Sequence, residues 1–101
     1  MKQYHELLIG SLEDPVEAAN YLNAVLAEND EKLFLVALRN VAEAQGGMLK
    51  LAKTLKLNRS NLYRIFSKNG NPEIKTLSKI LTYFGLKLTV VADPKKHLRA
   101  A

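Results

Sequence analysis

Five polar side chains within six consecutive residues have the types that read nucleic-acid bases. Arginine can form a bidentate pair with guanine, asparagine can do so with adenine, and serine is an adaptable hydrogen-bonding partner. At about 100° per residue, a helix over this stretch buries Leu62, Ile65 and Phe66 and turns its other side outward. The candidate base-reading residues on that side and in its first turn are Arg59, Ser60, Asn61, Tyr63 and Arg64.

The apolar residues around this stretch have the spacing of a helix-turn-helix. Two short helices that cross steeply need a small residue at the crossing, and Ala52 supplies it. Leu57 follows five residues later in the turn, and Leu62 follows after five more. The pattern predicts a helix-turn-helix over about residues 48–67 whose second helix enters the major groove. The alternative is plain packing, because any small helical bundle has similar apolar positions.

The net charge of +5 is divided unequally along the 101 residues. Residues 1–45 hold three basic and eight acidic side chains, whereas residues 46–101 hold twelve basic and two acidic ones. This asymmetry indicates a nucleic-acid face, with a solvated lysine surface as the alternative. The residues expected to contact phosphates without reading sequence are Lys50, Lys53, Lys56, Lys68, Asn69 and Lys75.

Capping and turn residues predict an all-α fold of five helices. Apolar side chains recur at helical spacing along each helix, and the predicted inward stripes include Val16, Leu26, Leu33 and Ile74. The residues that begin or end helices are Asp14-Pro15, Asn29-Asp30, Gly46, Asn58, Asn71-Pro72 and Gly85. We therefore expect one repressor-like domain over residues 14–92, after a leader over residues 1–13.

Residues 86–92 change to an alternating, β-branched pattern that predicts a short C-terminal strand. The rest of the chain offers this strand no partner, and an unpaired edge is a liability. We expect it to pair with its own copy in a homodimer, through Leu86, Leu88 and Val90. A flexible basic tail is expected over residues 93–101.

Several short motifs, in their order along the chain, resemble a known family. They are Tyr21-Leu22-Asn23-Ala24-Val25-Leu26, Leu38-Arg39-Asn40-Val41-Ala42-Glu43-Ala44, Ser60-Asn61-Leu62-Tyr63-Arg64, Gly70-Asn71-Pro72 and Gly85-Leu86-Lys87-Leu88. The helix-turn-helix resembles the Cro/repressor type. Over roughly residues 14–91 the chain more closely resembles the addiction-module antidote proteins, antitoxins of the HigA kind.

The resemblance implies a bacterial antitoxin that neutralises a small RNA-cleaving toxin of the RelE/HigB sort and represses its own operon as a dimer. The resemblance also implies that the base-reading positions of the repressor type correspond to Arg59, Ser60, Tyr63 and Arg64. Two positions depart from the repressor pattern. Met48 stands where a phosphate-contacting glutamine is common, and Lys56 where glycine is common. A left-handed lysine costs about 1 kcal/mol, which favours a slightly different turn.

The acidic segment over residues 1–45 is the natural site for a basic toxin. The alternative interpretation is that its carboxylates only stabilise helix N-termini. The candidate toxin contacts are Glu13, Glu17, Glu28, Asp30 and Glu31.

Other function classes find little support in the residues. The chain has no cysteine, and His5 and His97 lie in the two terminal segments, neither with a second histidine four residues away. We expect no metal, no cofactor and no enzyme activity. No apolar run reaches the roughly 18 residues that cross a bilayer, so we expect a cytoplasmic protein. A stand-alone phage- or plasmid-type regulator without a toxin, and a protein-interaction domain that does not bind DNA, remain open.

Overall fold

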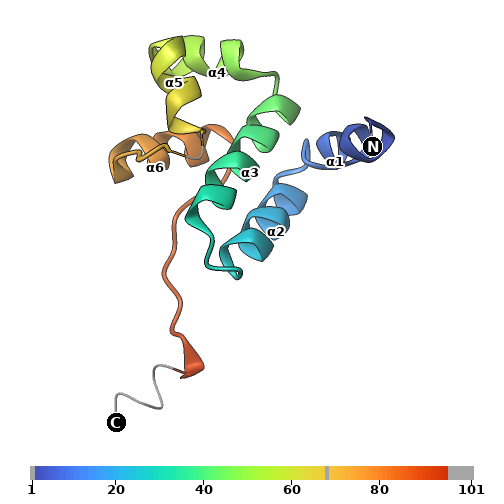
Figure 1. Cartoon of the computed structure of the whole chain (residues 1–101), viewed down its shortest axis with the longest axis vertical. Coiled ribbons are helices and arrows are strands. Elements are labelled where there is room, and N and C mark those ends of the chain that lie inside the picture. The colour runs from blue at the N-terminus through green and yellow to red at the C-terminus, as the bar shows by residue number, and fades with distance from the viewer. Residues whose placement is uncertain (1, 68, 96–101) are drawn as a thin grey trace.

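The structure is a computed structural model that describes residues 2–67 and 69–95 (Figure 1). Six helices follow one another along the chain. Within the described residues no helix is both long and apolar enough to span a bilayer, and none of these residues forms a strand. The helices are α1 (Lys2–Ser11), α2 (Pro15–Leu26), α3 (Glu31–Ala44), α4 (Met48–Leu55), α5 (Arg59–Ile65) and α6 (Ile74–Tyr83).

Three of the predicted caps are confirmed by side-chain hydrogen bonds. The Asp14 carboxylate accepts from the backbone N–H of Val16 at 2.9 Å. The Asp30 carboxylate accepts from the N–H of Leu33 at 3.0 Å. Asn58 caps α5 in the same manner. Each bond satisfies a donor that the first turn of a helix leaves without a partner.

The predicted start of the last helix at Asn71-Pro72 is wrong. Helix α6 begins at Ile74, its N-cap is Glu73, and no side chain caps it. The loop from α5 uses the intervening residues to cross to α6. Gly70 is needed in this loop because a Cβ there would lie 1.9 Å from the carbonyl oxygen of Ile65. Only a residue without a side chain permits so close a backbone approach.

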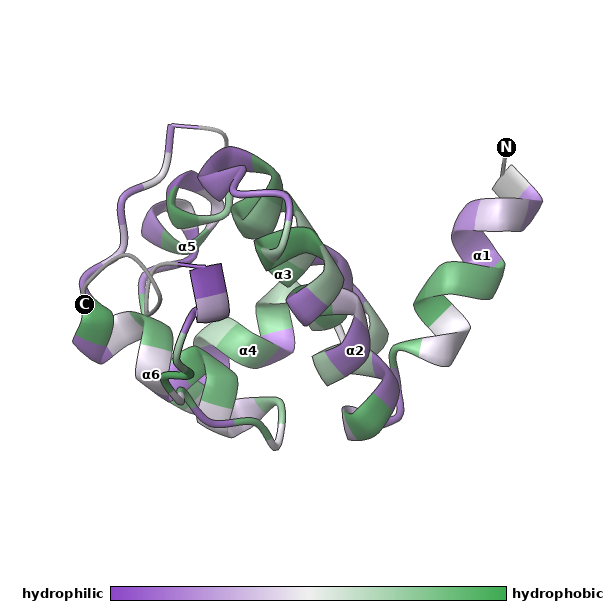
Figure 2. Ribbon diagram, turned by 90° about the horizontal axis from the view of Figure 1, so that it is seen from below, coloured by the Kyte–Doolittle hydropathy of each residue, from purple (hydrophilic) through white to green (hydrophobic). Residues whose placement is uncertain are grey.

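Helix α3 passes through the middle of the molecule, with α1 and α2 on one side and α4, α5 and α6 on the other (Figure 1). It contacts α1, α2 and α4, and its buried stripe includes Leu38 and Val41, both fully buried. In Figure 2 hydrophobic segments of several helices meet in the interior, and α1 lies on the far side from α6. The buried core residues are Leu12, Ala18, Leu22, Leu35, Ala37, Leu38, Val41, Ala42, Met48, Leu51, Ala52, Leu62, Phe66, Ile80, Leu81 and Phe84.

Four residues predicted to lie on inward stripes are exposed instead. They share a position in the first or last turn of a helix, where the helix surface passes beyond the edge of the core. Burial follows helical periodicity only where another helix covers that turn. The four residues are Val16, Leu26, Leu33 and Ile74.

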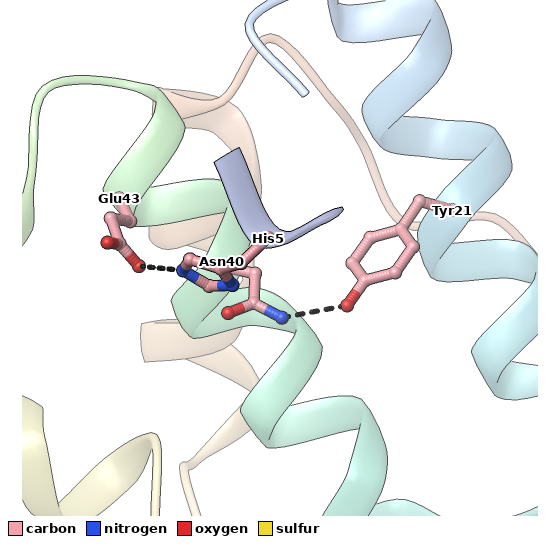
Figure 3. Close-up of polar contacts among 4 residues, drawn as sticks. All are labelled: His5, Tyr21, Asn40 and Glu43. Carbon is pink, nitrogen blue, oxygen red and sulfur yellow. Dashed lines mark hydrogen bonds and ion pairs between the residues drawn. The ribbon is translucent and has the colours of Figure 1, made fainter. Parts of the chain in front are cut away.

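The sixth helix is α1, within the segment predicted as a leader. It contacts α3, and Leu12 just beyond it is buried in the core. Figure 3 shows His5 of α1 directed at Glu43 of α3, with 3.7 Å between the imidazole Nε2 and the carboxylate. One turn earlier in α3, Asn40 donates a hydrogen bond of 2.9 Å to the hydroxyl of Tyr21 from α2. Polar contacts therefore link both N-terminal helices to α3.

The predicted strand over residues 86–92 is absent from the structure. Residues 86–93, which we call the C-terminal arm, leave the helices as an irregular, outstretched segment (Figure 1). A strand exists only through a ladder of hydrogen bonds to a neighbour, and no other described segment lies beside the arm as a strand. Of the predicted basic tail, residues 96–101 lie outside the described residues.

Candidate nucleic-acid interface

The turn between α4 and α5 is a left-handed helix end built on a lysine. Lys56 has φ 56° and ψ 43°, and the N–H of Leu57 donates to the carbonyl oxygen of Ala52 at 2.9 Å. These features define a Schellman motif, which commonly ends at glycine. The prediction of a different turn is therefore wrong. The Lys56 side chain is exposed, and the capping bond and the packing of Leu57 against the core offset the backbone strain.

Helix α5 turns one side into the core and the other to solvent, as its periodicity predicts. Leu62 is 0% exposed and Phe66, just after the helix, is 1% exposed. Ile65 is partly buried against the same core. The five candidate base-reading side chains are exposed on the remaining surface, namely Arg59, Ser60, Asn61, Tyr63 and Arg64. The fold therefore presents them together on one short helix.

Two of these side chains are oriented by a hydrogen bond within α5. The Arg64 guanidinium donates from Nη2 to the amide oxygen of Asn61. The hydroxyl of Ser67 donates to the carbonyl oxygen of Arg64 at 2.7 Å. The guanidinium is thus held along the exposed surface of the helix, with its other N–H donors available. A bidentate contact with a base edge needs such free, coplanar donors.

Tyr63 lies beneath an arginine from another helix. The guanidinium carbon of Arg39, on α3, is 5.6 Å from the centroid of the Tyr63 ring. This geometry is that of a cation–π contact, worth about 0.5–1 kcal/mol at an exposed site. Sequence reasoning did not select Arg39, because it lies in the acidic half of the chain and far from Tyr63 in sequence. No local signal would have found it.

Exposed lysines surround α5 on α4, the turn and α6. Lys79, which sequence reasoning also missed, lines the same shallow hollow as Lys56, between the end of α4 and α6. Its spacing of four residues from Lys75 is a signal that would have found it. Among the described residues, none of these lysines lies within ion-pair distance of a carboxylate. The exposed candidate phosphate contacts are Lys50, Lys53, Lys56, Asn69 and Lys75, and Lys68 lies outside the described residues.

A polar hollow of about 330 Å³ separates α5 from the loop that follows it. Asn61 and Arg64 line it from the helix, and Asn69 and Asn71 line it from the loop. Glu73, the first carboxylate after Glu43, lines the far wall. Glu73 therefore places one negative charge beside the candidate base-reading residues of α5.

A family model described as probable addiction module antidote protein matches residues 7–92. The chain belongs to the addiction module antidote family. An uncharacterized protein of Haemophilus influenzae is 34% identical over 70 residues, which cover 69% of this chain and 71% of that relative. No solved structure gives a significant match. Membership of the family gives the chain the role of an antitoxin, which implies a toxin as its partner.

The candidate toxin contacts of this antidote protein form two groups. Glu13 and Glu17 lie at the beginning of α2, whereas Glu28, Asp30 and Glu31 lie beyond its end. The twelve residues of α2 separate the groups by roughly 18 Å. All five are exposed. Asp30 also caps α3, so its carboxylate has the stabilising role of the alternative interpretation.

In the described part of this antidote protein, no group of three histidine, aspartate or glutamate side chains could hold a metal ion. His5 pairs with Glu43, and His97 lies outside the described residues.

The left-handed backbone at Lys56 makes a testable difference between two neighbouring lysines. Lys56→Gly removes the steric cost of that conformation, so we expect the free energy of unfolding to rise by about 0.5–1 kcal/mol. Lys53→Gly, inside α4, removes the same charge but loosens a helix, so it should lower the free energy by about 1 kcal/mol. Urea denaturation of both variants measures the difference. Destabilisation by both would contradict the left-handed turn.

Proposed function

We propose that this antidote protein is the antitoxin of a type II toxin–antitoxin module that also binds its own operator DNA and represses the operon. The observation that carries the proposal is the exposed face of α5, with arginine and asparagine side chains outward and Leu62 and Phe66 buried. The protein acts by binding, in the bacterial cytoplasm, without a cofactor or a catalytic step. Its toxin is a small RNA-cleaving protein of the RelE/HigB sort.

Helix α5 has the dimensions to enter the major groove. Its seven residues span about 10 Å, and the major groove is about 12 Å wide. Arg59 and Arg64 suit guanine, and Asn61 suits adenine. Lysines on α4 and α6 then neutralise phosphates on both sides of the groove. Arg39, stacked on Tyr63, fixes that ring beside the bases.

A single copy reads only one half-site. Repressors of this type bind two half-sites about 34 Å apart, which requires a two-fold symmetric dimer. The C-terminal arm supplies the contact, because Val90 and Val91 lie largely in solvent and Leu88 is 45% exposed, whereas Leu86 packs partly against the core. Leu86, Leu88 and Val90 are the residues that we assign to the dimer.

The toxin binds the acidic surface at the beginning of α2. Three large apolar side chains are exposed there and on α1, namely Tyr4, Leu7 and Val16. Glu13 and Glu17 flank them with negative charge. A toxin that cuts RNA must itself be basic. Apolar contacts provide the affinity for it, and the acidic rim around them provides a charge opposite to that of the toxin.

Arginine and lysine substitutions separate base reading from phosphate binding. Arg64→Ala should cost about 1–3 kcal/mol of operator binding and relax the preference for the operator over a scrambled duplex. Lys53→Ala should weaken both duplexes alike and reduce the salt slope by about 1. Fluorescence anisotropy over a salt series measures both effects. An unchanged operator preference in Arg64→Ala would contradict a base-reading role for α5.

Charge reversal at the two ends of α2 tests the toxin surface. When the chain is expressed with the product of the neighbouring reading frame, we expect the two to purify together. The double variant Glu13→Lys and Glu17→Lys should lower the affinity at least about tenfold, because like charges then meet at the contact. Calorimetry measures the affinity, and circular dichroism verifies folding.

The matched control reverses Glu28 and Glu31 to lysine and leaves the Asp30 cap intact. It should retain the toxin. The reverse result would place the toxin at the other end of α2. A chain that retains no partner, yet still binds the operator, would be a stand-alone regulator.

A further inference from the structure

The C-terminal arm exposes apolar side chains that a soluble protein ordinarily covers. Val90 is 97% exposed and Val91 84%, so both lie largely in solvent, and Leu88 is 45% exposed. The arm is anchored at its base by the N–H of Leu86, which donates to the carbonyl oxygen of Leu81 at 2.8 Å. Beyond Thr89 it leads away from the helices (Figure 1). It therefore extends in the direction of a surface outside its own chain.

Two adjoining hollows lie beside the base of the arm and share Leu26 and Phe34 as walls. The first, of about 360 Å³, is bounded by the arm's own residues 86–89. The second, of about 410 Å³, has no arm residue in its lining. Its other apolar walls are Leu35, Leu77 and Pro72, and Asp30 and Glu31 stand at its acidic side.

The arm and the second hollow are complementary in polarity, and Lys87 of the arm is opposite in charge to the acidic side of the hollow. The arm carries Lys87 before its apolar residues and Asp93 after them, and Lys95 follows the arm, whereas the hollow combines apolar walls with Asp30 and Glu31. Apolar contacts inside a rim of opposite charge are typical of specific interfaces. The chain's own arm does not fill its second hollow, since Val90 is almost completely exposed.

We propose that the arm of a second copy of this chain occupies the second hollow, with reciprocal exchange between the two copies. This inference rests on the proposed homodimer and gives it a defined contact. A two-fold axis makes the contact isologous, so each copy provides one arm and one hollow. The six residues 88–93, when extended, reach at most about 20 Å, enough to cross such an axis.

The exchanged arm would lie against the loop that positions α5. This loop, through Gly70, Asn71 and Pro72, lines the second hollow. The same three residues also line the polar hollow beside α5 that contains Asn61 and Arg64. The same loop approaches the end of α5 too closely to admit a side chain at Gly70. Dimer contact and base-reading helix therefore share one loop, which sets the spacing of the two α5 helices.

Cysteine cross-linking tests the exchange directly, because the chain has no cysteine of its own. One preparation carries Leu26→Cys in the shared wall, and a second, tagged preparation carries Val90→Cys in the arm. Under mild oxidation of the mixture we expect a covalent heterodimer, and its mass identifies the pair. Glu31→Cys, at the exposed side of the hollow, serves as a second acceptor in case Leu26→Cys fails to fold. Val16→Cys, exposed at the opposite end of α2, is the control and should give no heterodimer.

Two results would overturn the exchange while leaving the homodimer in place. In sedimentation experiments the wild-type chain would be a dimer, and Val90→Cys would cross-link only to itself, which means that the arms pair with each other. Alternatively, the dimer would persist and neither acceptor would cross-link. A wild-type chain that sediments as a monomer at micromolar concentration would overturn the homodimer and the exchange together.

Discussion

The candidate DNA-reading surface depends on the burial of two side chains. A helix of seven residues does not hold its shape alone in water, because forming the first turn costs more than the few hydrogen bonds return. Leu62 and Phe66 are removed from solvent against α4 and α6, and this burial keeps α5 helical. It also fixes the rotation of the helix. Every polar residue of α5 points outward because these two point inward.

The same constraint explains the strained turn before α5. If Lys56 took an ordinary right-handed conformation, α4 would continue and α5 would lose its crossing angle over Ala52. The left-handed lysine costs about 1 kcal/mol, far less than burial of a leucine and a phenylalanine contributes. The packing therefore determines the backbone conformation, and an exposed side chain at position 56 permits it.

The charges of the molecule are separated by its fold as well as by its sequence. Lysines and arginines gather on α4, α5 and α6, and five exposed acids lie at the two ends of α2, whereas Glu43 and Glu73 lie close to the α5 side chains. A polyanion and a basic protein can thus bind the same chain. The family assignment supports the basic protein, a toxin, as a partner. The exposed face of α5 supports the polyanion as a partner.

Much of this arrangement follows from local sequence, and the remainder depends on contacts between helices. Asp14, Asp30 and Asn58 predict helix starts because a cap involves only its own turn. The outer face of α5 follows from helical periodicity. The contact of Arg39 with Tyr63 has no local signal, and α1 has neither a capping residue nor a proline to mark it. The arm's alternating pattern predicts burial on one face, but a strand requires a partner that a single chain does not provide.

We propose that duplex DNA binds across α5 and that the acidic surfaces take no part. Titration of isotope-labelled protein with its own promoter duplex, followed by amide chemical shifts in NMR spectra, tests this claim residue by residue. The account predicts that the largest changes fall between Asn58 and Ser67 and at the neighbouring starts of α4 and α6. The amides from Glu28 to Glu31 should remain unchanged. Changes centred on that acidic loop, or none that distinguish the promoter from a scrambled duplex, would contradict it.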